Sequence, residues 1–217
     1  MDYAGRAARW LLGATDHPGG RALSAHLLDL LELPVGSLVA DLACGGGATL
    51  DLLASRGHLA VGVDLHPRHP RAVVGDAQRL PLAGATFDAV LLECSLSTFH
   101  SPSDALAEVV RVLRPGGVLG LTDVLLDRSG APAEVVATVD RLTRARGLDD
   151  YADEVRAAGL EVLDQQDRAV DSLALLARLR HRLPLSTQVR RCQQAARDGL
   201  LGYGLVVARR PGQPRQG

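Results

Sequence analysis

Short apolar runs alternate with helical patterns along most of this chain, and that alternation restricts the possible folds more than any other feature. Strands that alternate with helices pair in parallel and carry helices on both faces of the sheet. The runs are continuously apolar, as strands buried on both faces must be. The pattern predicts an α/β fold with a doubly wound, mostly parallel, seven-stranded sheet. Strands are expected at 37–43, 59–65, 71–76, 87–93, 118–126, 160–165 and 202–210, and helices at 47–57, 101–117, 132–146, 149–158, 171–182 and 186–198.

The chain has 217 residues, which is enough for one domain with a full core. No internal repeat and no second domain boundary interrupts the pattern. We expect a single domain over 1–210, in which 1–33 forms a helical N-terminal cover and 127–147 a helical insert beside the substrate pocket. A flexible polar tail is expected at 211–217.

A glycine-rich loop follows the first expected strand, in the segment VADLACGGGATL. In doubly wound sheets, ligands bind beyond the carboxyl ends of the strands, near such a loop. Gly45 and Gly47 allow a tight turn and a close approach of the backbone to a ligand, and a helix N-terminus follows them. Asp64 ends the second expected strand, 19 residues after Gly45, where a carboxylate can accept hydrogen bonds from two ribose hydroxyls.

Two classes of cofactor suit this loop, and two residues separate them. A dinucleotide-binding loop requires a third glycine at the position that Leu50 occupies. Asp41 stands just before the glycines, where its charge would repel a pyrophosphate but attract an amino group and a sulfonium. The sequence therefore favours S-adenosylmethionine over a nicotinamide dinucleotide.

Four segments carry a resemblance to a known family: VADLACGGG, VGVDLHP, GDAQRLPLAGATFDAV and VLRPGGVLGLTDV. In this order and spacing they resemble the class I S-adenosylmethionine-dependent methyltransferases, over roughly 37–126. The resemblance implies a Rossmann-like methyltransferase fold with an antiparallel last strand, and transfer of a methyl group that leaves S-adenosylhomocysteine. It also implies a cofactor site made of Asp41, Ala43, Gly45, Gly47, Asp64, Leu65, Asp76, Ala77, Gln78 and Glu93.

Within the class, LLECSLSTF resembles the small bacterial arsenite methyltransferases, which the resemblance implies use a cysteine at the position of Cys94. Thiolates bind soft, thiophilic centres when two or three of them converge. Cys44 is expected near Cys94, but the further cysteine of that family is missing and Cys192 lies far along the chain. We therefore expect Cys94 to pack in the pocket wall, with methylation of trivalent arsenic as the alternative.

No catalytic residue stands out, because methyl transfer from an activated sulfonium requires mainly alignment. Weak candidates on the substrate side are Cys94, His100 and Asp123, and Tyr3 and His17 are candidates to close over the cofactor. No cluster of ligands with metal-binding spacing is visible, so no metal site is expected.

Charge and composition narrow the partners. The net charge is −1 and basic residues form no aromatic-laced stripe, so we expect a small-molecule substrate rather than nucleic acid or a membrane. No signal-peptide pattern and no long apolar run is visible, so we expect a cytoplasmic protein. The sequence does not indicate an oligomeric state. The alternatives to a methyltransferase are a nicotinamide-dependent oxidoreductase and a non-catalytic protein that keeps the cofactor fold.

Overall fold

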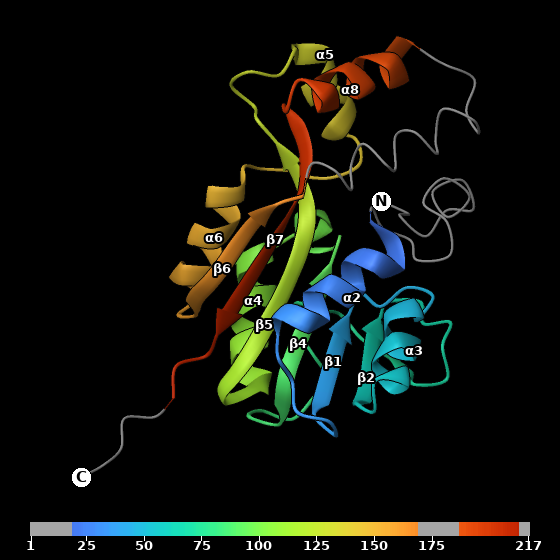
Figure 1. The fold of residues 1–217 in the computed structure, drawn as a ribbon, viewed down its shortest axis with the longest axis vertical. Helices are drawn as coiled ribbons and strands as arrows, with labels where there is room; N and C mark the ends of the chain where they lie inside the picture. Colours follow the sequence, from blue (N-terminus) through green and yellow to red (C-terminus); the bar gives the residue numbers. More distant parts are fainter. Residues whose placement is uncertain (1–18, 169–186, 213–217) are drawn as a thin grey trace.

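The computed structural model describes residues 19–168 and 187–212, which form one layered α/β unit around a single sheet (Figure 1). The expected helix at 171–182, the candidates Tyr3 and His17 and most of the expected tail lie outside the described residues. Among the described residues, no helix is both long enough and apolar enough to span a bilayer.

Seven strands form the sheet in the order β3-β2-β1-β4-β5-β7-β6. The first five pair in parallel, whereas β7 runs antiparallel to both β5 and β6. This confirms the predicted mostly parallel, doubly wound sheet with an antiparallel last strand. The strands are β1 Leu38–Leu42, β2 Leu59–Asp64, β3 Ala72–Val74, β4 Phe87–Glu93, β5 Leu113–Leu126, β6 Glu161–Asp167 and β7 Leu201–Arg209.

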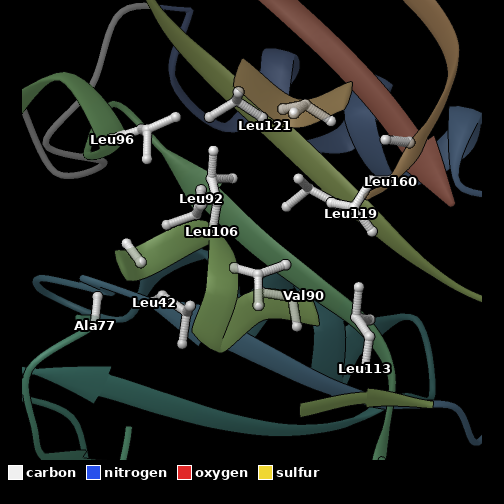
Figure 2. Close-up of a cluster of buried hydrophobic side chains, with 14 of the residues drawn as sticks. Leu42, Ala77, Val90, Leu92, Leu96, Leu106, Leu113, Leu119, Leu121 and Leu160 are labelled. Atoms are coloured by element: carbon white, nitrogen blue, oxygen red, sulfur yellow. The ribbon is translucent and has the colours of Figure 1, made fainter. Parts of the chain in front are cut away.

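Helices cover both faces of the sheet because alternate strand residues point to opposite faces. One face packs against α4 and α6 through a cluster that includes Leu92, Leu106 and Leu119 (Figure 2). The other face packs against α2 and α3 through a cluster that includes Leu27 and Leu91. The helices are α2 Gly20–Leu30, α3 Ala48–Ser55, α4 Pro102–Val112, α5 Ala133–Val139, α6 Leu148–Ala157 and α8 Thr187–Arg197, with a short 3-10 turn, η1, at Leu96–Thr98.

The N-terminal cover lies directly on the bare backbone of β5. A Cβ atom added at Gly120 would come within 3.0 Å of the Leu27 side chain, so the glycine allows α2 to approach the strand closely. Leu23 and Leu27 are almost fully buried by this contact. The helical reading of the cover is therefore correct for its described part.

Two element boundaries differ from the sequence prediction. The strand expected at 118–126 begins at Leu113, because Pro115 prevents the helix from continuing beyond Val112. The helix expected at 132–146 ends at Val139; later in the segment, the Arg146 carbonyl instead accepts a backbone hydrogen bond from Leu126. The helical part of the 127–147 segment is thus limited to α5, which packs with α8 beyond the carboxyl ends of the parallel strands (Figure 1).

Truncation of Leu27 tests whether the cover is an integral part of the core. Leu27→Ala should lower the free energy of unfolding by about 2–5 kcal/mol, because it leaves a cavity between α2 and β5. The exposed Leu142 is the matched control, and Leu142→Ala should change stability by less than about 0.5 kcal/mol. Urea unfolding at equilibrium measures both values. Equal losses in the two variants would show that α2 contributes little to the core.

Candidate functional site

Three neighbouring strands bring the predicted cofactor residues to one edge of the sheet. In the central strand, Asp41 of β1 pairs with Gly62 of β2 on one side and with Leu91 of β4 on the other. Asp64 and Glu93 end those two flanking strands. The carboxyl ends of β1, β2 and β4 therefore place three acidic side chains around the glycine-rich loop that follows β1.

The glycine-rich loop alternates into left-handed backbone conformations. Ala43, Gly45 and Gly47 have φ angles of 57°, 51° and 81°, and α3 begins at the next residue. A non-glycine residue at positive φ, such as Ala43, is energetically unfavourable and is typical of functional loops. The His69 ring covers the loop so closely that a Cβ atom at Gly47 would lie 2.5 Å from it. Gly45 and Gly47 thus form a tight turn, and the His69 ring packs against it.

Asp64 points toward the glycine-rich loop. One carboxylate oxygen accepts the Gly45 N–H at 2.9 Å, and the other accepts the His66 N–H at 2.8 Å. A carboxylate offers about four acceptor positions, so these two bonds orient the group and leave room for two further donors. This geometry suits a pair of ribose hydroxyls.

Asp41 carries a carboxylate that burial makes costly to ionise. The side chain is only 3% exposed. Desolvation, followed by repulsion from Glu93 and from Asp64, raises the pKa of Asp41 well above its usual value. Three carboxyl groups therefore stand close together at this edge of the sheet, and a cationic ligand would stabilise their ionised forms.

Glu93 joins two helices rather than standing free in the pocket. Its Oε2 accepts the Ser24 hydroxyl of α2 at 2.8 Å, and its Oε1 accepts the Thr49 hydroxyl of α3 at 2.7 Å. Neither hydroxyl was singled out by sequence reasoning, because nothing in the local pattern shows that α2 crosses β4. The position of Thr49, two residues after Gly47, is the one local signal that could have indicated its role.

The adenine-side candidates form a small hydrogen-bonded turn after β3. Asp76 accepts the Gln78 backbone N–H at 2.9 Å, and the Gln78 Oε1 accepts the Ser101 N–H at 2.6 Å. Ala77 is buried, and Leu65 is 61% exposed on the loop after β2. Gln78 thus orients the turn, while Asp76 remains exposed for an incoming donor.

Cys44 and Cys94 both pack against the protein interior. A Cβ atom at Gly62 would lie 2.6 Å from the Cys44 Sγ, so the thiol fills the space above that glycine. Burial, with repulsion from nearby carboxylates, raises the pKa of Cys44 to about 12, which disfavours the reactive thiolate. Cys94 is buried on the α2 face, and its thiol contacts the hydroxyl of Tyr203.

The substrate-side candidates occupy different environments. Asp123 is buried, and its carboxylate accepts both the backbone N–H of Ser97, at 2.8 Å, and the Ser97 hydroxyl, at 2.6 Å. Thr143 donates to the same Ser97 hydroxyl, so Asp123 ties η1 to the segment after α5. Desolvation raises the pKa of Asp123 despite these bonds. His100 is exposed just beyond η1, and the two side chains do not form a shared catalytic pair.

Metal ligands do not converge in the described part of the chain. No group of three or more His, Cys, Asp or Glu side chains there could hold a metal ion. His69 contacts Asp51 at 3.2 Å and packs on the glycine-rich loop.

Replacement of Gly47 tests the shape of the loop. Gly47→Ala and Gly116→Ala both place a side chain at a φ angle near +80°, which costs about 1–2 kcal/mol. Only Gly47→Ala also forces a side chain against His69, which should lower the free energy of unfolding by about 1–3 kcal/mol more. Urea unfolding compares the two, and His69→Ala should recover part of the loss in the Gly47→Ala background. Identical losses at the two glycines would contradict the contact.

The pKa of Asp41 predicts a pH-dependent stability for the ligand-free protein. Because the native pKa exceeds that of the unfolded chain, the native state binds more protons, and stability falls as the pH rises from about 4 through the native pKa. Asp41→Asn should remove a slope of at most about 1.4 kcal/mol per pH unit. Urea unfolding at a series of pH values measures it, with the exposed Asp153→Asn as control. A slope unchanged by Asp41→Asn would refute the assignment.

Comparison with known proteins supports this arrangement of sequence and fold. Residues 40–121 match the methyltransferase domain family. The demethylmenaquinone methyltransferase of Corynebacterium kroppenstedtii is 37% identical over 97 residues, covering 41% of this chain and 42% of that protein. The 27-O-demethylrifamycin SV methyltransferase of Amycolatopsis mediterranei is 30% identical over 169 residues, covering 67% of this chain and 61% of that protein. The chain thus spans about half the length of the curated relatives it matches.

Solved structures share the fold at low sequence identity. Geranyl diphosphate methyltransferase in complex with SAM superposes with a TM-score of 0.75 at 23% identity, covering 88% of this chain and 85% of that chain. The [4+2]-cyclase SpnF superposes with a TM-score of 0.69 at 23% identity, covering 88% and 80%. Residues 40–121 therefore carry the sequence of a methyltransferase domain, within a chain that has the fold of S-adenosylmethionine-dependent methyltransferases.

Proposed function

We propose that this protein transfers a methyl group from S-adenosylmethionine to a small-molecule acceptor. The observation that carries the proposal is the buried Asp41 carboxylate, held between Glu93 and Asp64 at the glycine-rich loop. Three carboxyl groups at one edge of the sheet disfavour a pyrophosphate and favour the ammonium and sulfonium of this cofactor, which would stabilise their ionised forms. The match of residues 40–121 to the methyltransferase domain family agrees with this charge pattern.

Different residues around the loop would contact different parts of the cofactor. Asp41, Ala43, Gly45 and Gly47 would face the methionine part, and Asp64 the ribose hydroxyls. Leu65 would cover the adenine. Asp76 would accept a hydrogen bond from the adenine amino group, with Ala77 and Gln78 beside it. Gly45 N–H already orients the Asp64 carboxylate, so little reorganisation is required when the ribose binds.

The chemistry requires alignment more than proton transfer. S-adenosylmethionine supplies an activated methyl group, and the chain supplies orientation and exclusion of water. The edge formed by η1, His100 and the segment after α5 lies where an acceptor would meet the methyl group. Asp123 keeps that edge in place through Ser97, which favours a structural role for it over proton abstraction.

A small-molecule acceptor is proposed from the names of the relatives and from the surroundings of the cysteines. The named relatives include methyltransferases of demethylmenaquinone and demethylrifamycin SV, both small molecules. Methylation of trivalent arsenic is the weaker alternative, because Cys94 is buried against Tyr203 and no third cysteine stands near it among the described residues. That the protein is cytoplasmic and binds no nucleic acid stays a prediction, as does its oligomeric state.

The fold alone does not settle the reaction, since the cyclase SpnF shares it. A nicotinamide-dependent oxidoreductase is disfavoured by the acidic pocket and by Leu50 in place of a third glycine. A non-catalytic protein that keeps the cofactor fold remains the other alternative, and it differs in having no turnover.

Thermal melting with S-adenosylhomocysteine, and separately with NADH, tests the cofactor. At about 100 times its dissociation constant a ligand stabilises by about 2.7 kcal/mol, which raises Tm by roughly 5–10 °C for a domain of this size. We expect this shift with S-adenosylhomocysteine alone, and its loss in Asp64→Ala but not in the exposed control Asp153→Ala.

Each other outcome of the melting experiment points elsewhere. A shift with NADH alone would indicate an oxidoreductase. No shift with either ligand would contradict the proposal and favour a non-catalytic role.

A further inference from the structure

Both oxygens of the Glu93 carboxylate accept hydrogen bonds from helices that are far apart in the sequence. Ser24 belongs to the N-terminal cover α2, and Thr49 to the first turn of α3. Their hydroxyl oxygens are 3.5 Å apart, so the carboxylate and the two hydroxyls form one connected cluster. Ser24 is 2% exposed and Thr49 is 7% exposed, so both hydroxyls depend on protein partners rather than water.

Most of the α2 interface is apolar, and two other polar contacts join the helix to its neighbours: His26 hydrogen-bonds to Gln166 of β6 at 3.0 Å, and Asp29 pairs with Arg56 at the end of α3 at 2.6 Å. Leu23, Leu27, Leu28 and Leu31 pack against the sheet, and apolar contacts of this kind are non-directional. A hydrogen bond to an ionised carboxylate is directional and about twice as strong as one between neutral groups. Glu93 therefore adds a directional contact at the end of β4 to a helix that is held there mainly by burial of its leucines.

The same carboxylate acts on the glycine-rich loop through α3. Thr49 lies two residues after Gly47, in the turn whose backbone N–H groups face the expected ligand. Fixing the Thr49 side chain therefore fixes the start of α3 relative to the end of β4. Glu93 therefore joins the cover to the first turn of α3, while the ion pair between Asp29 and Arg56 joins the cover to the other end of that helix.

We propose that Glu93 is a positioning residue that joins α2 to the first turn of α3 and so holds the cover and the glycine-rich loop in the arrangement that binds the cofactor. The inference rests on the proposed function, since it names the cofactor as the ligand of that arrangement. It differs from the expectation that Glu93 lines the pocket as a direct contact. Glu93 positions the two helices through its hydrogen bonds with the Ser24 and Thr49 hydroxyls.

The hydrogen-bonded bridge of Ser24, Glu93 and Thr49 affects affinity through the fraction of molecules in which it is formed. If only a fraction of molecules holds α2 and α3 in place, the apparent dissociation constant rises by the inverse of that fraction. Removing two hydrogen bonds to a charged group is sufficient to reduce that fraction to about one tenth or less. An amide in place of the carboxylate can accept from one hydroxyl and donate to the other, so it preserves the bridge without the charge.

The experiment measures two properties of the full chain and its variants: binding of S-adenosylhomocysteine by calorimetry, and hydrogen exchange of the backbone amides of α2. The variants are Glu93→Ala, Glu93→Gln, the double variant Ser24→Ala/Thr49→Val, and the triple variant that combines the double with Glu93→Ala. Ser55→Ala is the matched control, because it removes a hydroxyl at the far end of α3 that bonds only to its own helix in the structure.

We expect Glu93→Ala and the double variant each to weaken binding by about tenfold and to speed exchange in α2. The triple variant should bind no more weakly than either, since all three remove the same bridge. Glu93→Gln should stay within about threefold of the wild type, with α2 protected, and Ser55→Ala should match the wild type.

Three results would overturn the inference. The first is that Glu93→Gln behaves as Glu93→Ala does, which would indicate direct action of the charge on the ligand. The second is that the double variant binds as the wild type does, and the third is that the losses add fully in the triple variant. Failure of the wild type to bind S-adenosylhomocysteine would count against the proposed function instead, and exchange in α2 would still test the bridge. If Glu93→Ala does not fold, the comparison of Glu93→Gln with the double variant decides.

Discussion

The register in which β1 pairs with β2 and β4 is the constraint on which the site depends. It sets Asp41 beside Gly62 and Leu91, so that Asp64 and Glu93 leave the sheet just beyond it on either side. A slip of one residue would turn every side chain of β1 to the other face and carry Asp41 away from the loop. The apolar neighbours of Asp41 in β1 prevent such a slip, because burial of Val39 and Leu42 on opposite faces permits only one register.

The grouping of acidic side chains at this edge of the sheet lowers the stability of the ligand-free protein. Asp41 is buried beside two other acidic side chains, and its raised pKa means that burial and repulsion make its ionised form costly in the native state. Natural folds retain such destabilising groups mainly where a ligand makes use of them. A cationic cofactor would supply the missing counter-charge, whereas a dinucleotide would add to the repulsion. Electrostatics therefore distinguishes ligands that the strand order alone does not.

The sequence predicted the sheet well because its central strands, such as β1 and β4, are largely apolar runs that the local pattern reveals. It also predicted that Gly45 and Asp64 would meet, since the ends of adjacent parallel strands share one edge. The partners of Glu93 were not predictable, because Ser24 reaches it only through the crossing of α2 over β4, a tertiary contact between residues far apart in the sequence. The helix expected at 132–146 failed for a similar reason, since Arg146 bonds to β5 rather than to its own helix.

The reaction is harder to deduce than the cofactor because different parts of the chain control them. The proposed cofactor edge is built from strand ends, whose geometry the sheet dictates, whereas the proposed acceptor edge is built from η1 and the segment after α5. Asp123 illustrates the difference: it ends up buried and bonded to Ser97 because two irregular segments fold over it. Loops of this kind vary between proteins of one fold without disturbing the sheet. A methyltransferase and a cyclase can therefore share the strand order seen here, and the choice of acceptor rests on these loops.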